Sequence, residues 1–257
     1  MLELGKILEN RPVAKDIYEM VLEAPEIAKA ARPGQFVNLR LSDKLDPLLR
    51  RPISLHGIDP EKGTITMLYL IVGKGTAMMR DMEAGAVIDV LGPLGNGWNC
   101  DFEGRYAVLI GGGIGIAPLY PLAKALAKAG KTVELIVGAK NKEYLTDLSP
   151  YETTGVRVTV TTDDGSAGIK GFVTEALANS IQEKTCDYIY ACGPLPMLKF
   201  VEKLAIANKK PGQVSTESHM GCGLGICLLC PSKVTAGGYK RTCTDGPVFE
   251  IGELDYE

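Results

Sequence analysis

Four of the seven cysteines lie close together beyond residue 220, and thiolates grouped in this way can bind a metal or a metal cluster. They are Cys222, Cys227, Cys230 and Cys243, with the spacing Cys-x4-Cys-x2-Cys-x12-Cys. A Cys-x4-Cys-x2-Cys run with a later fourth cysteine is the plant-type ferredoxin spacing for a [2Fe–2S] cluster. We therefore predict that these four thiolates hold a [2Fe–2S] cluster.

The residues between the cysteines favour the same interpretation. The backbone must wrap tightly around the inorganic core, and glycine tolerates the positive φ angles that such a wrap requires. Apolar side chains would shield the cluster from water. The glycines are Gly221, Gly223 and Gly225, and the apolar residues are Leu224, Ile226, Leu228 and Leu229.

Zinc is the alternative metal, and four unligated thiols are the third interpretation. Structural zinc sites prefer paired Cys-x2-Cys units, and this segment has one such unit without a partner pair. An odd number of cysteines, behind an N-terminus that lacks a signal-peptide pattern, argues against a disulfide framework. Cys100, Cys186 and Cys192 are predicted to be small buried residues.

A glycine-rich turn is the second candidate site. The apolar run at 106–110 predicts a buried parallel strand, and residues 118–129 predict a helix. Between them lie Gly111, Gly112, Gly113, Ile114 and Gly115, where a dinucleotide phosphate would meet the amides of a helix N-terminus. The alternative is a tight turn that binds nothing. The spacing departs from G-x-G-x-x-G, because Ile116 stands at the third glycine position.

A third candidate is the sequence Arg50-Arg51-Pro52-Ile53-Ser54. The planar guanidinium of Arg51 could pair with a pyrophosphate, and the Ser54 hydroxyl could hydrogen-bond a flavin ring. Two arginines beside a strand are also compatible with a solvated edge.

Three stretches of different pattern must position these residues. Residues 1–100 alternate short apolar runs with turn signals, which predicts a small antiparallel barrel or sandwich with a helical turn at 78–83. Residues 101–210 alternate strands with helices, which predicts a doubly wound α/β domain. Residues 211–257 are rich in glycine and cysteine and predict a segment that depends on a bound cofactor for its stability.

Composition excludes other classes of function. A formal net charge of −3 predicts no general attraction to nucleic acid. The sequence has no apolar run of the length that crosses a membrane, so we expect a cytoplasmic protein without a membrane partner. With two histidines, His56 and His219, a histidine-based metal site is not expected, and both are predicted to be structural or interfacial.

Together these motifs resemble the ferredoxin reductase family of FAD- and NAD(P)-binding proteins. With the cysteine run added, the whole chain resembles the electron-transfer subunits of type B dihydroorotate dehydrogenases. The segments that carry this resemblance are 48–55, 111–120, 217–227 and 243–249. It implies an antiparallel FAD-binding β-barrel (1–100), an NAD-binding α/β domain (101–210) and a C-terminal iron–sulfur segment (211–257).

The resemblance also implies which residues contact the cofactors. Those matching the FAD site are Arg51, Pro52, Ile53, Ser54, Leu68, Tyr69, Leu70, Gly75 and Thr76. Those matching the nicotinamide side are residues 111–115 together with Asp163, Asp164, Cys192, Gly193 and Pro194. The family often has tyrosine where Ile53 stands, which leaves Tyr69 as the candidate for stacking on the flavin. Cys192 would lie near the nicotinamide and is the one residue considered for a catalytic role.

The implied function is electron transfer between NAD and a partner, by way of FAD and the [2Fe–2S] cluster. The implied partner is an FMN-containing catalytic subunit that oxidises dihydroorotate, in a heterotetramer with two copies of each chain. Alternatives are the equivalent subunit of a sulfide dehydrogenase, a ferredoxin–NADP oxidoreductase or a hydrogenase, a stand-alone NAD(P)H reductase, and a zinc-stabilised nucleotide-binding regulator. The preference for NAD over NADP and the role of Glu217 stay open.

Overall fold

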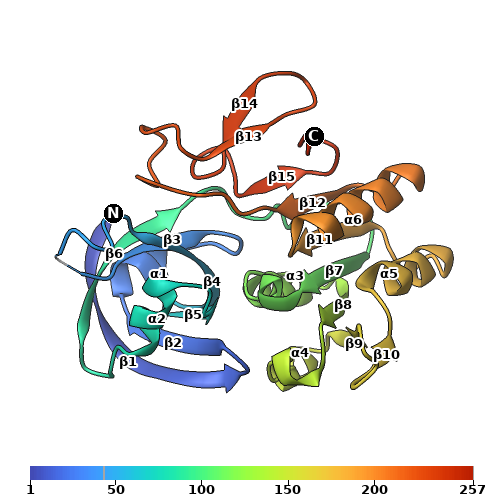
Figure 1. Ribbon diagram of the computed structural model, residues 1–257. Coiled ribbons are helices and arrows are strands. Elements are labelled where there is room, and N and C mark those ends of the chain that lie inside the picture. The colour runs from blue at the N-terminus through green and yellow to red at the C-terminus, as the bar shows by residue number, and fades with distance from the viewer. Residues whose placement is uncertain (43, 257) are drawn as a thin grey trace.

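The first part of the chain forms a closed antiparallel barrel in the computed structural model, which describes residues 1–42 and 44–256 (Figure 1). Neighbouring strands follow the order β1-β2-β5-β4-β3-β6. The strands are β1 (Leu2–Ala14), β2 (Ile17–Glu23), β3 (Phe36–Arg40), β4 (Arg51–Asp59), β5 (Thr64–Leu70) and β6 (Val87–Leu94). Two short helices accompany them, α1 (Pro25–Ala30) and α2 (Lys74–Arg80). The predicted barrel is therefore confirmed, and the helical turn predicted at 78–83 starts earlier, at Lys74.

Side chains alternate between the barrel interior and its outer face. On β5, Ile65, Met67 and Tyr69 belong to the barrel core. Because successive side chains of a strand point to opposite faces, Leu68 and Leu70 point outward. Pro52 and Ser54 on β4 share this outer face, whereas the candidate flavin residues Ile53 and Tyr69 lie on the core side.

The second part of the chain forms a seven-stranded sheet with the order β10-β9-β8-β7-β11-β12-β15. Its strands are β7 (Tyr106–Gly112), β8 (Thr132–Ala139), β9 (Arg157–Thr162), β10 (Ile169–Lys170), β11 (Tyr188–Cys192), β12 (Gly212–Ser215) and β15 (Val248–Glu250). All neighbours are parallel except β12 and β15, which are antiparallel. The helical elements are η1 (Gly113–Ile116), α3 (Leu119–Lys128), η2 (Lys142–Tyr144), α4 (Ser149–Glu152), α5 (Val173–Gln182) and α6 (Leu195–Ala207).

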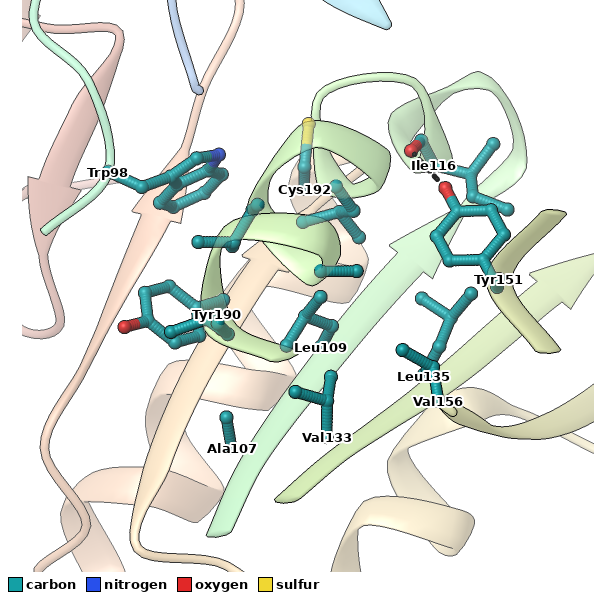
Figure 2. Packing of buried hydrophobic residues seen from close by; sticks show 14 of the residues in the cluster. Trp98, Ala107, Leu109, Ile116, Val133, Leu135, Tyr151, Val156, Tyr190 and Cys192 are labelled. Atoms are coloured by element: carbon teal, nitrogen blue, oxygen red, sulfur yellow. Dashed lines mark hydrogen bonds between the residues drawn. The ribbon is translucent and has the colours of Figure 1, made fainter. Parts of the chain in front are cut away.

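Helices cover both faces of this sheet, which explains why β7 is apolar without alternation. Ala107 and Leu109 face the core under α3 and α4, while Val108 and Ile110 face the core under α5 and α6. Figure 2 shows the first of these cores. There the hydroxyl of Tyr151 donates to the carbonyl of Ile116 at 3.1 Å, which fixes the turn that follows β7.

The cysteine-rich segment lies over both the barrel and the sheet (Figure 1). It forms a two-stranded ribbon of β13 (Pro231–Lys233) and β14 (Tyr239–Arg241), and β15 then extends the sheet beside β12. On the barrel side, Phe36 and Leu94 pack in one core with Met220 and two of the cysteines. The segment thus shares the cores of both larger parts. Among residues 1–42 and 44–256, no helix combines the length and hydropathy needed to cross a bilayer.

The barrel and the sheet meet at His56, on β4. Its Nδ1 donates to the carbonyl of Ala117 at 3.0 Å, and its ring stacks on Tyr120 with 5.1 Å between ring centroids. Burial lowers the pKa of His56 to about 4, and the hydrogen bond to Ala117 opposes this shift without cancelling it. His56 is thus an interface residue, as the sequence predicted.

This lowered pKa predicts an acid-sensitive interface. Between pH 6.5 and pH 4 the unfolded chain binds a proton at position 56 that the folded chain excludes. The free energy of unfolding should therefore fall as the pH drops through this window, by up to about 3 kcal/mol. Urea unfolding at several pH values measures this slope. His56→Gln should flatten it, whereas His219→Gln, at an exposed position, should leave it unchanged. Equal slopes in all three proteins would contradict the prediction.

Candidate cofactor-binding sites

The four C-terminal cysteines form two pairs. In the first, the Cys222 amide donates to the Cys227 Sγ at 3.4 Å, and the Cys227 amide donates to the Cys222 Sγ at 3.5 Å. In the second, Cys230 and Cys243 are buried together against the barrel residues Phe36 and Leu94. The turn between the first two cysteines requires glycine at Gly223, where φ is +71°.

Backbone amides stabilise the thiolate form of Cys222 in the first pair. The amides of Cys227, Leu224 and Ile226 point at the Cys222 sulfur, with the Leu224 amide 3.3 Å away. Although desolvation opposes ionisation, these donors lower the pKa of Cys222 to about 6. Burial and the neighbouring Cys230 raise the pKa of Cys243 to about 11. A bound metal would displace this proton, because the thiolate is the ligand.

This donor set fits a two-iron cluster. Two irons with two thiolates each require cysteines in two pairs, and inward-pointing amides stabilise the sulfurs of such a cluster. The two pairs therefore fit a [2Fe–2S] cluster in number and chemistry, and the assignment of the four ligands stays a prediction.

The apolar residues of the cysteine loop lie at the surface of the chain. The exposed fractions are 49% for Leu224, 79% for Ile226, 66% for Leu228 and 49% for Leu229. Their shielding of a bound cluster from water stays a prediction. These four residues are called the apolar rim below.

The two arginines at the start of β4 have different environments. The Arg50 guanidinium forms two hydrogen bonds with the Asp89 carboxylate, at 2.8 and 2.9 Å, so it is part of the barrel framework. Arg51 donates to the carbonyls of Leu49 and Arg50, and within the described part of the chain it pairs with no carboxylate. Its side chain lies directly against Gly75, where an added Cβ would displace the guanidinium. Arg51 is thus the arginine available to an anionic ligand.

The remaining candidate flavin residues of β4 divide between its two faces, and Ile53 packs against the barrel core. Leu55 points into the barrel core, so Ser54 and Pro52 alternate with it toward the outside. At the first turn of α2 the Thr76 hydroxyl accepts hydrogen bonds from the amides of Val72 and Gly73, at 2.9 and 3.2 Å. These contacts order the turn that precedes α2, next to Arg51. Such an arrangement fits a flavin ring and its pyrophosphate on the outer face of the barrel.

Tyr69 does not offer a stacking surface. It is 2% exposed within the barrel core, its hydroxyl donates to Asn10 at 2.8 Å, and its ring lies against Tyr18. The expectation that this ring replaces the family's stacking tyrosine is therefore wrong. Leu68 and Leu70, on the opposite face of β5, are the residues of this strand that point toward the flavin side.

The predicted nicotinamide residues meet at the carboxyl edge of the sheet. Gly111 on β7 lies opposite Cys192 on β11, so the glycine turn and the Cys192-Gly193-Pro194 turn are neighbours. Asp163 and Asp164 follow β9 at the same edge. The carboxyl edge of a parallel sheet is where nucleotides bind in this class of fold. Residues far apart in the sequence thus lie along one edge of the sheet, and their contact with the nicotinamide stays a prediction.

Cys192 is held as a neutral thiol. It is buried in the core that Figure 2 shows, and desolvation, aided by the charge of Glu217, raises its pKa to about 12. A thiol with this pKa is a poor nucleophile at neutral pH. Its position beside the glycine turn supports a packing role rather than covalent chemistry.

Position 115 of the glycine turn has no room for a side chain. A Cβ at this position would collide with the backbone carbonyl of Cys192, and backbone cannot move aside as a flexible side chain can. We expect Gly115→Ala to lower the free energy of unfolding by about 2 kcal/mol and to weaken NADH binding. Thermal melts and NADH titration measure both. Gly73→Ala, where a Cβ meets open space, should cost no more than about 1 kcal/mol. Equal effects of the two changes would contradict this account.

Asn38 is a residue that the sequence did not single out. It is fully buried on β3, and its side-chain oxygen and nitrogen both lack a hydrogen-bond partner among the residues described. The signal in the sequence is a single amide within the apolar run Phe36-Val37-Asn38-Leu39. That signal is weak, because the contact that buries the amide is made by Gly223 of the cysteine loop, far away in the sequence.

Comparison with known proteins places the chain in a family. Residues 217–255 match the iron-sulfur cluster binding domain of dihydroorotate dehydrogenase B, and residues 109–203 match the oxidoreductase NAD-binding domain. The chain is 42% identical over 252 residues to the dihydroorotate dehydrogenase B (NAD(+)) electron transfer subunit of Geobacillus sp. strain WCH70, covering 96% of each chain. It is 38% identical to the same subunit of Desulforamulus reducens, covering 98% of each.

Solved structures share the fold of the chain. An NADH-dependent reduced ferredoxin-NADP oxidoreductase structure matches with a TM-score of 0.90 and 36% identity, over 98% of this chain and 90% of the other. A cytochrome P450 reductase from Amycolatopsis matches with a TM-score of 0.69 and 23% identity, over 81% and 66%, which shows the shared fold alone. The chain belongs to the family of dihydroorotate dehydrogenase B (NAD+) electron transfer subunits.

Proposed function

We propose that this chain transfers electrons between an FMN-containing dihydroorotate-oxidising subunit and NAD+. The four cysteines would hold the [2Fe–2S] cluster. The outer face of β4, together with Arg51 at the start of that strand, would hold FAD, and the carboxyl edge of the sheet would hold the nicotinamide. The observation that carries the proposal is the set of two cysteine pairs, of which Cys230 and Cys243 pack against the barrel that bears Arg51. The relatives named above are electron transfer subunits, which supports the same role.

The chemistry divides between the cofactors and the chain. When bound, FAD exchanges a hydride with the nicotinamide and single electrons with the [2Fe–2S] cluster. The chain supplies positions and charges: Arg51 a cation for the pyrophosphate, Ser54 a hydroxyl for the flavin ring, and the cysteine loop amides that stabilise sulfur. Cys192 keeps its proton at neutral pH, so it has no acid–base role in this proposal. The division into segments 1–100, 101–210 and 211–257 is proposed on the same basis, with one cofactor for each.

The apolar rim supports a partner at the cluster. Four large apolar side chains are exposed around thiolates that must exchange electrons with another protein. Large apolar side chains exposed close together on one short loop favour a protein interface. We assign the rim to the contact with the catalytic subunit, in a heterotetramer with two copies of each chain. The cytoplasmic location stays a prediction from the sequence.

A related activity has specific support from one comparison. The ferredoxin-NADP oxidoreductase structure matches almost the whole chain at 36% identity, so the corresponding role in that kind of complex is the second candidate. The closer agreement in sequence with the dihydroorotate dehydrogenase B subunits, at 42% identity, favours the first.

Anaerobic purification of the chain with its native partners tests the proposal. We expect flavin and about two irons per chain, bleaching of both chromophores by NADH, and an FMN-containing partner that reduces them with dihydroorotate. A partner that reduces them with reduced ferredoxin and not with dihydroorotate would support the second candidate. A colourless chain that contains zinc would overturn both.

A further inference from the structure

Asn38 lies between two of the proposed cofactor sites. On β3 it is opposite Pro52 of β4, so it shares the outer face of the barrel with Pro52 and Ser54 of the flavin motif. Phe36, two residues earlier on the same face, packs against Cys230 and Cys243. The cysteine segment therefore packs on the outer face of β3, and the Asn38 amide lies in that contact.

The cysteine loop approaches this amide closely. A Cβ placed on Gly223 would lie 2.8 Å from the Asn38 Nδ2, so the backbone next to Cys222 rests on the amide. Asn38 is 0% exposed, and no described residue hydrogen-bonds either of its polar side-chain atoms. A buried amide without partners is costly, and exchanging its oxygen and nitrogen would not help because both are unpaired. Its partners must come from what binds there.

We propose that the Asn38 side chain donates a hydrogen bond from Nδ2 to a sulfur of the [2Fe–2S] cluster and thereby tunes its reduction potential. The inference rests on the proposed assignment of the cluster to the four cysteines. Thiolate and sulfide sulfurs are acceptors, so they need the Nδ2 donor and cannot use the oxygen. Asn38 is a positioning residue on the flavin-bearing face, not a ligand.

The physical consequence follows from charge. Reduction adds an electron to the cluster, and a hydrogen-bond donor stabilises the more negative form. Hydrogen bonds to the sulfurs are among the main determinants of such potentials. Removing the Asn38 donor should therefore make the cluster harder to reduce without removing any of its ligands.

Isotope labelling tests the hydrogen bond in the unaltered protein. The full chain is prepared with ¹⁵N in the side-chain amide of asparagine, reduced, and examined by pulsed EPR. We expect a ¹⁵N coupling to the reduced cluster that disappears in Asn38→Leu. The other nearby amide, Asn96, already donates to the carbonyls of Asp245 and Val248 at 3.1 and 2.8 Å, so it is not expected to contribute.

A redox titration of the same proteins tests the tuning. Asn38→Leu keeps the shape and removes the donor, so at a fixed potential the ratio of reduced to oxidised cluster should fall about tenfold. For one electron this is a midpoint about 59 mV lower. Leu94→Met is the matched control, because Leu94 contacts the same glycine and a volume-conserving change should leave the midpoint unchanged.

The outcomes separate this inference from the assignment on which it rests. A chain without iron would overturn the cluster site itself. Full iron content without a ¹⁵N coupling, or with equal midpoints in wild type and Asn38→Leu, would overturn the inference alone. Altered flavin retention with an unchanged cluster midpoint would assign the amide to the flavin and would equally overturn it.

Discussion

Replacing Cys227 with serine is expected to reduce the iron content from about two per chain to nearly none and to abolish the cluster's visible absorption. Cys227 is exposed and belongs to the pair whose sulfurs accept backbone hydrogen bonds. Serine keeps the shape but presents a hydroxyl, which ionises far less readily than a thiol. Iron analysis and the absorption spectrum measure the loss. NADH should still bleach the flavin, while electron transfer to the partner subunit should fall to background.

The chain supplies a matched control for this experiment. Cys100→Ser alters a partly buried thiol outside the C-terminal group, so iron content and spectrum should equal those of the wild type. Unchanged iron in Cys227→Ser would mean that this cysteine is not a ligand. Loss of iron in both variants would instead indicate a general effect on folding.

Replacing Arg51 with alanine is expected to weaken FAD binding by roughly 10- to 100-fold, because a charge-assisted hydrogen bond to the pyrophosphate is lost. Arg51 lacks a carboxylate partner in the described ranges and lies against Gly75. Fluorescence titration of the flavin-free chain with FAD measures the affinity. Arg51→Lys should recover part of it, because lysine keeps the charge without the planar fork.

Arg80 provides the comparison for Arg51. It is exposed on α2 and hydrogen-bonded to the Asp81 carboxylate at 2.6 Å, so Arg80→Ala should bind FAD as the wild type does. If Arg51→Ala also retains its flavin, Arg51 is not part of the site.

The architecture was predictable where the pattern of side chains is strong. The apolar run of β7 has to be covered on both faces, and the glycines after it have to lie at the edge of the sheet where helix amides begin. The cysteine spacing was equally informative, because the ligand geometry of a cluster leaves few alternatives. Both signals are local in the sequence.

What the sequence did not reveal depends on contacts between distant segments. Tyr69 donates a hydrogen bond to Asn10, which lies on another strand. The Asn38 amide is covered by Gly223 of the distant cysteine loop. Ile226 is exposed, although apolar residues are usually buried. In the sequence, an apolar residue of a partner interface cannot be told from an apolar residue of the core. A strand as short as β15 gives no periodic signal.

The pairing of β15 with β12 ties the cysteine segment into the large sheet. The cysteine loop comes just before β15 and packs on the barrel, while β15 covers the outer edge of β12. Phe249 on β15 is buried in the core under α5 and α6, so the sheet itself holds this strand in place. A chain cut before β15 would leave amides and carbonyls of β12 unpaired, and such an open strand edge favours association with other chains.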